Sequence, residues 1–116
     1  MEKTVKIGNA EILMKATGNT PKRYREMFNK DLIVEYQRLL KNIDDNGNFT
    51  DKADLGVMDR LAYTMAKQAN NDIPDIDEWL DQFAPLDIYN AMADILGVWV
   101  RSSETLSESK KKQSNR

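Results

Sequence analysis

The sequence predicts a mainly α-helical protein of one domain, in which a small N-terminal β-hairpin precedes about five helices. Apolar residues alternate with a period of two before Thr20 and follow a helical period of about 3.6 after it. The 116 residues are 41% hydrophobic and 31% charged, which suits a single globular domain. We expect this domain to span residues 1–101 and a disordered polar tail to span residues 102–116.

The composition excludes several classes of protein. The chain has no cysteine and no histidine, which excludes disulfides, zinc–sulfur sites and the commonest general base. No apolar run approaches the length that spans a bilayer, and the N-terminus has no signal-peptide block. We therefore expect a protein of the cytoplasm that is not an enzyme, with no catalytic residue, no cofactor, no metal and no membrane partner.

The net charge of −2 is unevenly distributed along the chain. Residues 102–116 hold two glutamates and four basic residues, a charge of +2, which leaves −4 on the remainder. A dedicated nucleic-acid binder would have a concentrated basic face instead. We expect no nucleic-acid partner.

The N-terminal segment has the pattern of a hairpin. Val5 and Ile7 alternate with polar neighbours, Gly8-Asn9 is a turn dipeptide, and residues 11–15 form a second strand. A lone two-stranded hairpin is marginal in water. This one should therefore pack on the helices or extend a neighbour's sheet.

The change to helix comes at Thr20, whose hydroxyl can cap a first helix that places Pro21 in its first position. Asp31 can cap a second helix over residues 31–43, and a polar loop follows over residues 42–51. A third helix is expected over residues 54–69. The apolar residues predicted to line the first two helices are Tyr24, Met27, Phe28, Leu32, Ile33, Tyr36, Leu39, Leu40 and Ile43.

Two further helices complete the predicted domain. Asp75 begins a short acidic helix that Pro85 ends, and a last helix follows over residues 86–101. Its wide apolar face, typical of a central helix or one shared with a partner, consists of two stripes: Ile88, Met92, Ile95 and Trp99, then Tyr89, Ala93, Leu96 and Val100. Because a small domain has too little surface to cover both stripes easily, and a hairpin has open edges, we expect a homo-oligomer joined through either feature.

The loop after the second helix partly matches a calcium-binding EF-hand. With Asn42 as position one, Asp44, Asn46 and Gly47 fall at positions three, five and six. Ala53 stands at position twelve, where a bidentate Glu is needed. We predict a connecting loop that does not bind calcium in the micromolar range.

Three other groups of residues have a functional and a structural interpretation. The acidic cluster, which could hold magnesium, is better explained as a helix start matched to the dipole: Asp72, Asp75, Asp77, Glu78 and Asp81. Three basic residues near the start of the first helix oppose its dipole: Lys22, Arg23 and Arg25. They either pair with the domain's own carboxylates, which we favour, or meet an acidic stripe on a partner. The aromatic residues Trp79, Phe83, Tyr89 and Trp99 are expected in the core.

The combined pattern resembles the tail assembly chaperones of long-tailed phages and prophages of Gram-positive bacteria. The order and spacing of several segments support the resemblance, which covers residues 1 to about 101. They are residues 15–21 (KATGNTP), Tyr24-Arg25, Phe28, Asp31-Leu32, residues 61–69 (LAYTMAKQA), residues 73–83 (IPDIDEWLDQF) and the closing helix to Trp99.

The resemblance implies a helical protein that coats the tape measure protein before the tail tube polymerises and that is absent from the finished virion. It also implies a longer, frameshifted product that brings in tail tube subunits. Lys110-Lys111-Lys112 is compatible with an adenine tract on which a ribosome could slip. The alternative is a small helical regulatory or DNA-binding prophage protein, although no short helix pair leads into a basic recognition helix. An enzyme is a distant third.

Overall fold

The computed structural model describes residues 1–102, which form a β-hairpin followed by six helices. The mainly helical fold with an N-terminal hairpin is thus as predicted, with one helix more than expected. The elements are β1 (Glu2–Ile7), β2 (Ala10–Lys15), α1 (Thr20–Phe28), α2 (Leu32–Lys41), α3 (Gly56–Ala69), α4 (Ile76–Leu80), α5 (Asp87–Asn90) and a last helix over residues 92–102.

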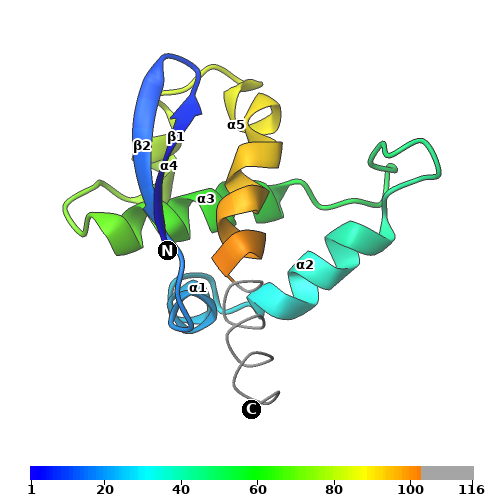
Figure 1. Ribbon diagram of the computed structural model, residues 1–116, viewed down its shortest axis with the longest axis horizontal. Helices are drawn as coiled ribbons and strands as arrows, with labels where there is room; N and C mark the ends of the chain where they lie inside the picture. Colours follow the sequence, from blue (N-terminus) through cyan, green and yellow to red (C-terminus); the bar gives the residue numbers. More distant parts are fainter. Residues whose placement is uncertain (103–116) are drawn as a thin grey trace, which may run out of the picture.

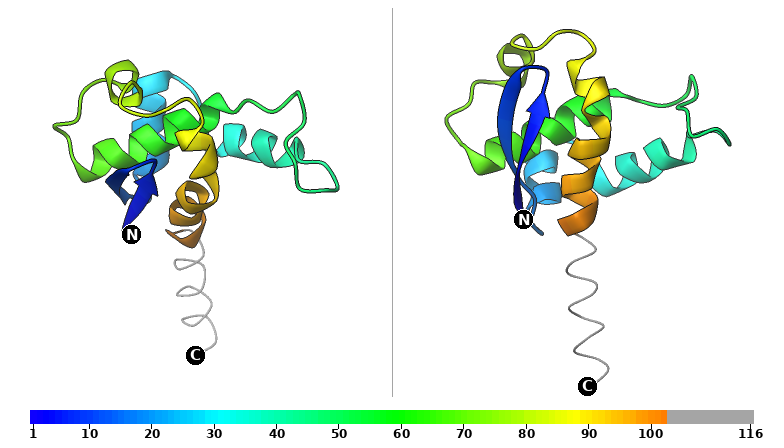
Figure 2. Two further views of the ribbon diagram at one scale, coloured as in Figure 1. Left: turned by 90° about the horizontal axis from the view of Figure 1, so that it is seen from above. Right: turned by 45° about the horizontal axis from the view of Figure 1, so that its top comes forward.

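Helix α3 is the element around which the others pack. It contacts β2, α1, α2, α4 and α5, and the hairpin and the last helix stand side by side across it (Figure 1). Figure 2 shows the same arrangement from above, with α1 and α2 on the far side of α3 from α5. The small residues of α3, such as Ala62 and Ala66, allow the neighbouring elements to approach it closely. The buried residues of α3 are Val57, Met58, Leu61, Ala62, Tyr63, Thr64, Met65 and Ala66.

The predicted hairpin is confirmed. Its strands are antiparallel, with Val5 opposite Ile12 and Ile7 opposite Ala10, so that Gly8 and Asn9 form the two-residue turn. Gly8 has a φ of 60°, which glycine adopts without strain. Val5, Ile7 and Met14 face the core, and β2 packs on α3. This packing explains how a two-stranded sheet is stable here.

The predicted cap at Asp31 is confirmed, and Asp75, predicted to begin the short acidic helix, caps α4. The Asp31 side chain accepts a hydrogen bond from the backbone N–H of Val34 at 3.0 Å, and that of Asp75 accepts one from Glu78 at 2.9 Å. The prediction for Thr20 is wrong, because α1 already includes it and Asn19 is the N-cap residue. The buried Thr20 hydroxyl instead donates to Oε1 of Gln68 on α3 at 2.7 Å.

The predicted last helix over residues 86–101 is divided in two. Ala91 lies between α5 and the helix over residues 92–102, with φ −92° and ψ 4°. Its backbone N–H is directed at the carbonyls of Asp87, Ile88 and Tyr89 together, so the helix tightens and stops before it restarts.

The two stripes of this segment have different surroundings. Ile88, Met92, Ile95 and Trp99 are buried, as expected of a central helix. In the other stripe, Tyr89 and Ala93 are exposed, while Leu96 and Val100 are partly buried. The prediction that Tyr89 belongs to the core is therefore wrong.

The end of the described chain is held to the hairpin. Ser102, expected as the first residue of the tail, is in the last helix and donates from its hydroxyl to the carbonyl of Ala16 at 3.2 Å. The rest of the predicted tail, including Lys110-Lys111-Lys112, lies outside the described residues. Within residues 1–102, no helix combines the length and the apolar composition needed to cross a bilayer.

Candidate functional site

The loop that resembles an EF-hand is closed by its own hydrogen bonds. The Asp44 carboxylate accepts from the backbone N–H groups of Asn46 and Asn48, each at 2.9 Å. The Thr50 N–H donates to the carbonyl of Asn42 at 2.8 Å, and Gly47 takes a φ of 82°. Asp44 therefore stabilises the turn of the loop itself, as Asp side chains commonly do in turns. The absence of calcium binding stays a prediction.

Of the acidic cluster, Asp72 precedes α4, and the interpretation as a helix start is wrong for Asp81, which is the C-cap residue. The other three residues lie at the start of α4. Asp75 caps it, and Asp77 and Glu78 lie in its first turn. Across residues 1–102, no three acidic side chains come close enough together to hold a metal ion. The hydroxyl of Tyr63 donates to the Pro74 carbonyl at 2.6 Å, which fixes the approach to α4. Burial, and then the charge of Asp75, raise the pKa of Tyr63.

The basic residues of α1 have separate surroundings. Lys22 pairs with Glu26 one turn later at 3.5 Å, with both side chains exposed. Arg23 donates to Oδ1 of Asn71 at 3.0 Å, and Arg25 is exposed. The preferred interpretation, pairing with the domain's own carboxylates, is thus confirmed for Lys22.

The other predicted aromatic core residues lie inside. Trp79 and Trp99 are buried, and Phe83 is partly buried against the core. Trp79 makes edge-to-face contacts with Tyr63 and Phe83, with ring centroids 5.5 and 5.0 Å apart. Tyr63, Trp79 and Phe83 therefore form a packed aromatic cluster around α4.

A polar network that the sequence analysis did not identify joins α1, α2 and α3. The buried hydroxyl of Tyr24 donates to Oε1 of Glu35 at 2.5 Å and accepts from Nε of Arg60 at 2.8 Å. Arg60 also pairs with Oε2 of Glu35 at 3.2 Å and with Oδ2 of Asp54 at 2.9 Å. The signal available in the sequence was a single arginine inside the apolar run of α3, which must find partners if it is buried.

The electrostatics of this network point to a structural role. Burial and the hydrogen bond to Glu35 raise the pKa of Tyr24. Burial disfavours the charged form of Arg60 and so lowers its pKa, but the hydrogen bonds to Tyr24 and Asp54 outweigh burial, and the pKa of Arg60 is raised. Arg60 lowers the pKa of Asp54. Each of these groups has a partner, so the network holds three helices together.

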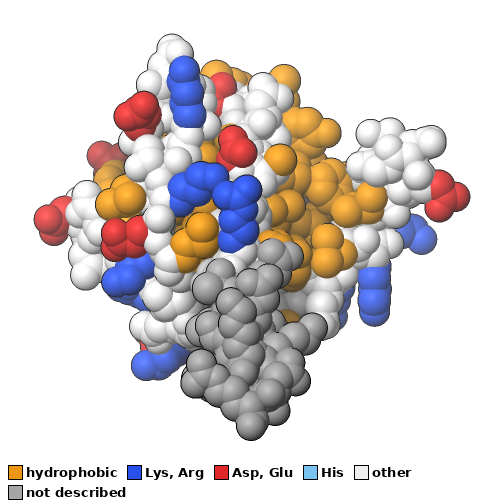
Figure 3. All heavy atoms as spheres, viewed as in Figure 1, with side chains coloured by type: hydrophobic (Ala, Val, Ile, Leu, Met, Phe, Trp, Pro, Cys, Tyr) orange, Lys and Arg blue, Asp and Glu red, His pale blue; other side chains and the backbone are white. Residues whose placement is uncertain are grey.

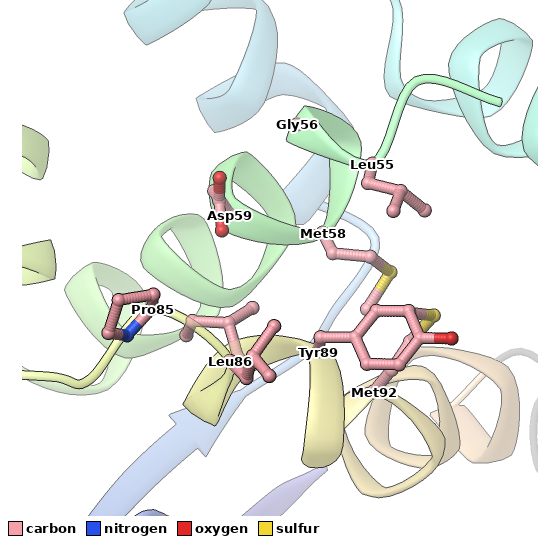
Figure 4. A pocket seen from close by; sticks show the side chains of 9 residues that line it. Leu55, Gly56, Met58, Asp59, Pro85, Leu86, Tyr89 and Met92 are labelled. Carbon is pink, nitrogen blue, oxygen red and sulfur yellow. The ribbon is translucent and has the colours of Figure 1, made fainter. Parts of the chain in front are cut away.

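A pocket of about 240 Å³ opens between the start of α3 and α5 (Figure 4). Met58, Ile88 and Met92 are buried, whereas Leu55 and Tyr89 are 39% and 50% exposed. Leu86 is 64% exposed. The lining residues are Leu55, Gly56, Met58, Asp59, Pro85, Leu86, Ile88, Tyr89 and Met92.

One wall of this pocket carries a charge. Asp59 projects from α3 across from Leu86 (Figure 4) and is partly buried. Burial raises the pKa of its carboxyl, which the nearby charge of Arg60 only partly offsets. Within residues 1–102 the Asp59 carboxylate has no hydrogen bond or ion pair, because Arg60 is directed to Tyr24, Glu35 and Asp54.

The exposed apolar surface continues beyond the pocket. Tyr36 of α2 packs edge-to-face on Trp99, with ring centroids 6.3 Å apart, which places α2 beside the last helix. Figure 3 shows hydrophobic side chains gathered beside the last helix, towards α2 and the loop before α3. We call this surface the apolar face and define it by Ile33, Tyr36, Leu40, Leu55, Leu86, Tyr89 and Leu96.

The apolar face is the candidate functional site, because large contiguous apolar patches on a folded domain mark surfaces that bind other molecules. Comparison of the chain with protein families, curated proteins and solved structures found no match.

Proposed function

We propose that this protein is a phage tail assembly chaperone that binds the tape measure protein in the host cytoplasm and is not part of the finished virion. The apolar face is the observation that carries the proposal. In this face, Leu86 and Tyr89 are at least half exposed, and Ile33 and Leu40 are nearly half exposed. The protein acts by binding and catalyses no reaction.

The chemistry of the face suits a client that is apolar in stripes. A tape measure protein is long and largely helical, so its apolar stripes need cover until the tail tube encloses them. Met58 and Met92 in the pocket are flexible and polarisable, and can adapt to sites that are repeated but not identical. One small domain can therefore bind many positions along the same client.

The proposal includes tail tube recruitment by a longer product of the same gene. A slip at the codons of Lys110-Lys111-Lys112 would start the new sequence after Ser102, whose hydroxyl bonds the Ala16 carbonyl at the end of the described domain. The gene should then carry an adenine-rich tract at the codons of Lys110-Lys111-Lys112 and an overlapping downstream frame. Codons that break this tract, with no overlapping frame, would contradict this part of the proposal.

The main proposal is tested by expressing the tape measure protein with and without this chain. We expect the tape measure protein to be soluble and to co-purify with the tagged chain, and to aggregate when expressed without it. The matched control is a chain with Leu86→Gln and Tyr89→Ala, two changes at exposed positions that should leave the fold intact. Failure of the wild-type chain to solubilise or retain the tape measure protein would overturn the proposal.

A further inference from the structure

We propose that the pocket between α3 and α5 takes one large apolar side chain of a helical segment, and that Asp59 pairs with a lysine or arginine one turn away on that segment. The inference rests on the proposed function, since the segment is assigned to the tape measure protein. It specifies which part of the apolar face anchors the client, and which sequence pattern the client must have.

The size and lining of the pocket fit an apolar anchor. Its volume of about 240 Å³ exceeds the roughly 150 Å³ of an apolar cavity that binds benzene, so it can hold a Leu, Met or Phe side chain. Met58, Ile88 and Met92 form a buried floor, and Leu55 and Leu86 form an exposed rim. Interface hot spots usually consist of an anchoring side chain in a buried pocket, with a rim of surrounding contacts that excludes water.

Charge complementarity identifies the second recognition element. Other carboxylates near the pocket are occupied: Asp54 pairs with Arg60, and Asp87 accepts from the backbone N–H of Ala84 at 2.9 Å. Asp59 is partly buried and has no partner within residues 1–102. A partly buried carboxylate gains most from a cationic partner that also excludes water. The charge of −4 outside the tail favours the approach of such a segment.

The shape of the apolar face favours a helix as the occupant. From the pocket the face continues past Leu96 of the last helix to Tyr36 and Leu40 of α2. A helix presents apolar side chains at three- and four-residue steps along one stripe, and can place a basic residue beside its anchor with the same spacing. The predicted client motif is thus a large apolar residue with Lys or Arg three or four positions away, followed by further apolar residues on the same stripe.

The experiment measures binding of the full-length chain to fluorescent peptides that tile the tape measure protein. Each peptide has about 25 residues, roughly seven helical turns, and binding is followed by anisotropy. We expect the tight binders to contain the motif. Leu86→Gln and Asp59→Lys should each weaken them about tenfold or more, as expected for losing an anchor or a charged hydrogen bond. The matched controls Met27→Gln and Asp45→Asn, at exposed positions outside the pocket, should bind like the wild type.

A charge exchange makes the test specific for Asp59. Replacing the basic residue of a tight-binding peptide with Glu should weaken its binding to the wild-type chain and restore binding to the Asp59→Lys chain. Circular dichroism melts of each variant confirm that it is folded. No such rescue, or peptides that bind Leu86→Gln and Asp59→Lys like the wild type, would overturn the pocket assignment.

The outcomes separate this inference from the proposed function. If the tape measure protein binds but the pocket variants have no effect, the proposed function stands and the pocket assignment fails. If the wild-type chain binds neither the tape measure protein nor any peptide, both fail. A wild-type dimer that Leu86→Gln dissociates, with peptide binding unchanged, would assign the pocket to a second copy of the chain and overturn the inference.

Discussion

At the scale of single residues, Arg60 shows how a buried charge is made compatible with an apolar helix. Its side chain is 18% exposed and is shared among Tyr24, Glu35 and Asp54, so that no donor is directed into an apolar region. Glu35 is 12% exposed, and its close partners are Arg60 and Tyr24, with the exposed Lys30 ammonium 4.0 Å from its Oε2. The three helices that contribute these residues are therefore held by one network.

Loss of Arg60 should destabilise the protein strongly. Arg60→Met keeps most of the stem of the side chain but leaves the Glu35 carboxylate with only the distant, exposed Lys30 as a cation, at an expected cost of about 2–4 kcal/mol. Tyr24→Phe leaves the ion pair in place and should cost about 1 kcal/mol. Urea unfolding measures both free energies.

The control for this prediction is Glu26→Gln, which removes the exposed pair with Lys22 and should change stability by less than about 0.5 kcal/mol. An Arg60→Met chain as stable as Glu26→Gln would show that the network contributes little.

Asp59 should make the protein less stable as the pH rises. Burial raises the pKa of its carboxyl, so the unfolded chain loses this proton before the folded chain does. Ionised Asp59 therefore costs stability above its folded pKa, and the cost disappears below its ordinary pKa of about 3.9. Asp59→Asn should stabilise the protein at neutral pH, by less than about 1 kcal/mol because solvent screens the partly exposed group. Unfolding curves at neutral and acid pH measure the difference.

Asp54 should have the opposite effect of pH on stability, because its pKa is lowered where that of Asp59 is raised. The hydrogen bond from Arg60 lowers its pKa, so its contribution to stability is present above the ordinary pKa and is lost as the pH falls through the folded value. Asp54→Asn should accordingly destabilise at neutral pH, and less at acid pH. If Asp59→Asn were also destabilising at neutral pH, the view of Asp59 as an unpaired carboxylate kept for binding would be wrong.

At the scale of elements, the turn of the hairpin and the start of α5 depend on each other. Gly8 has a φ of 60°, and a Cβ added there would lie 2.4 Å from Oδ2 of Asp87. That same oxygen accepts from the backbone N–H of Ala84 at 2.9 Å, which holds the turn before α5. The hairpin tip thus helps to place one wall of the pocket.

Gly8→Ala should destabilise the protein by about 2 kcal/mol or more, because it adds left-handed strain to a steric clash with Asp87. Gly18→Ala is the matched control, since a Cβ there meets nothing within 4 Å and its φ is not positive. It should be neutral or stabilise by up to about 1 kcal/mol. Thermal unfolding of the two variants tests the prediction, and equal melting temperatures would contradict it.

The elements that could be predicted from the sequence are those with local signals. Asp31 and Asp75 cap helices through hydrogen bonds to residues three positions later, and Gly8-Asn9 sets its own turn. Thr20 has the same local signal as these caps, but its hydroxyl is taken by Gln68, 48 residues away. The break between α5 and the last helix at Ala91 could not be predicted, because no glycine or proline stands at or beside this position.

At the scale of the whole molecule, the candidate site depends on contacts that no local pattern contains. Arg60 meets Tyr24 across 36 positions of the chain, and the pocket is assembled from the start of α3 and the segment around α5. The sequence did predict two apolar stripes on the last helix. Which stripe faces solvent is decided by how α2 and α3 pack on it, and so Tyr89 could not be placed in advance.

Self-association should occur through the hairpin and leave the apolar face free. The sheet has two strands, so each strand has one neighbour and one outer edge. Met1 and Ala16 exchange both backbone hydrogen bonds. Hydrogen-bonded and non-hydrogen-bonded pairs alternate along an antiparallel ladder, so the Thr4–Leu13 pair is of the second kind and directs its N–H and C=O groups outwards. Leu13 is also 45% exposed, and an unprotected apolar edge favours pairing with another strand.

Light scattering over a wide concentration range should therefore find a wild-type species larger than a monomer. Leu13→Lys places a charge at the edge and should yield a monomer that still binds the tape measure protein, because the pocket is unchanged. Leu86→Gln should keep the oligomer and lose tape measure binding. A wild-type monomer at every concentration, or an oligomer that survives Leu13→Lys, would show that the hairpin edges do not join subunits.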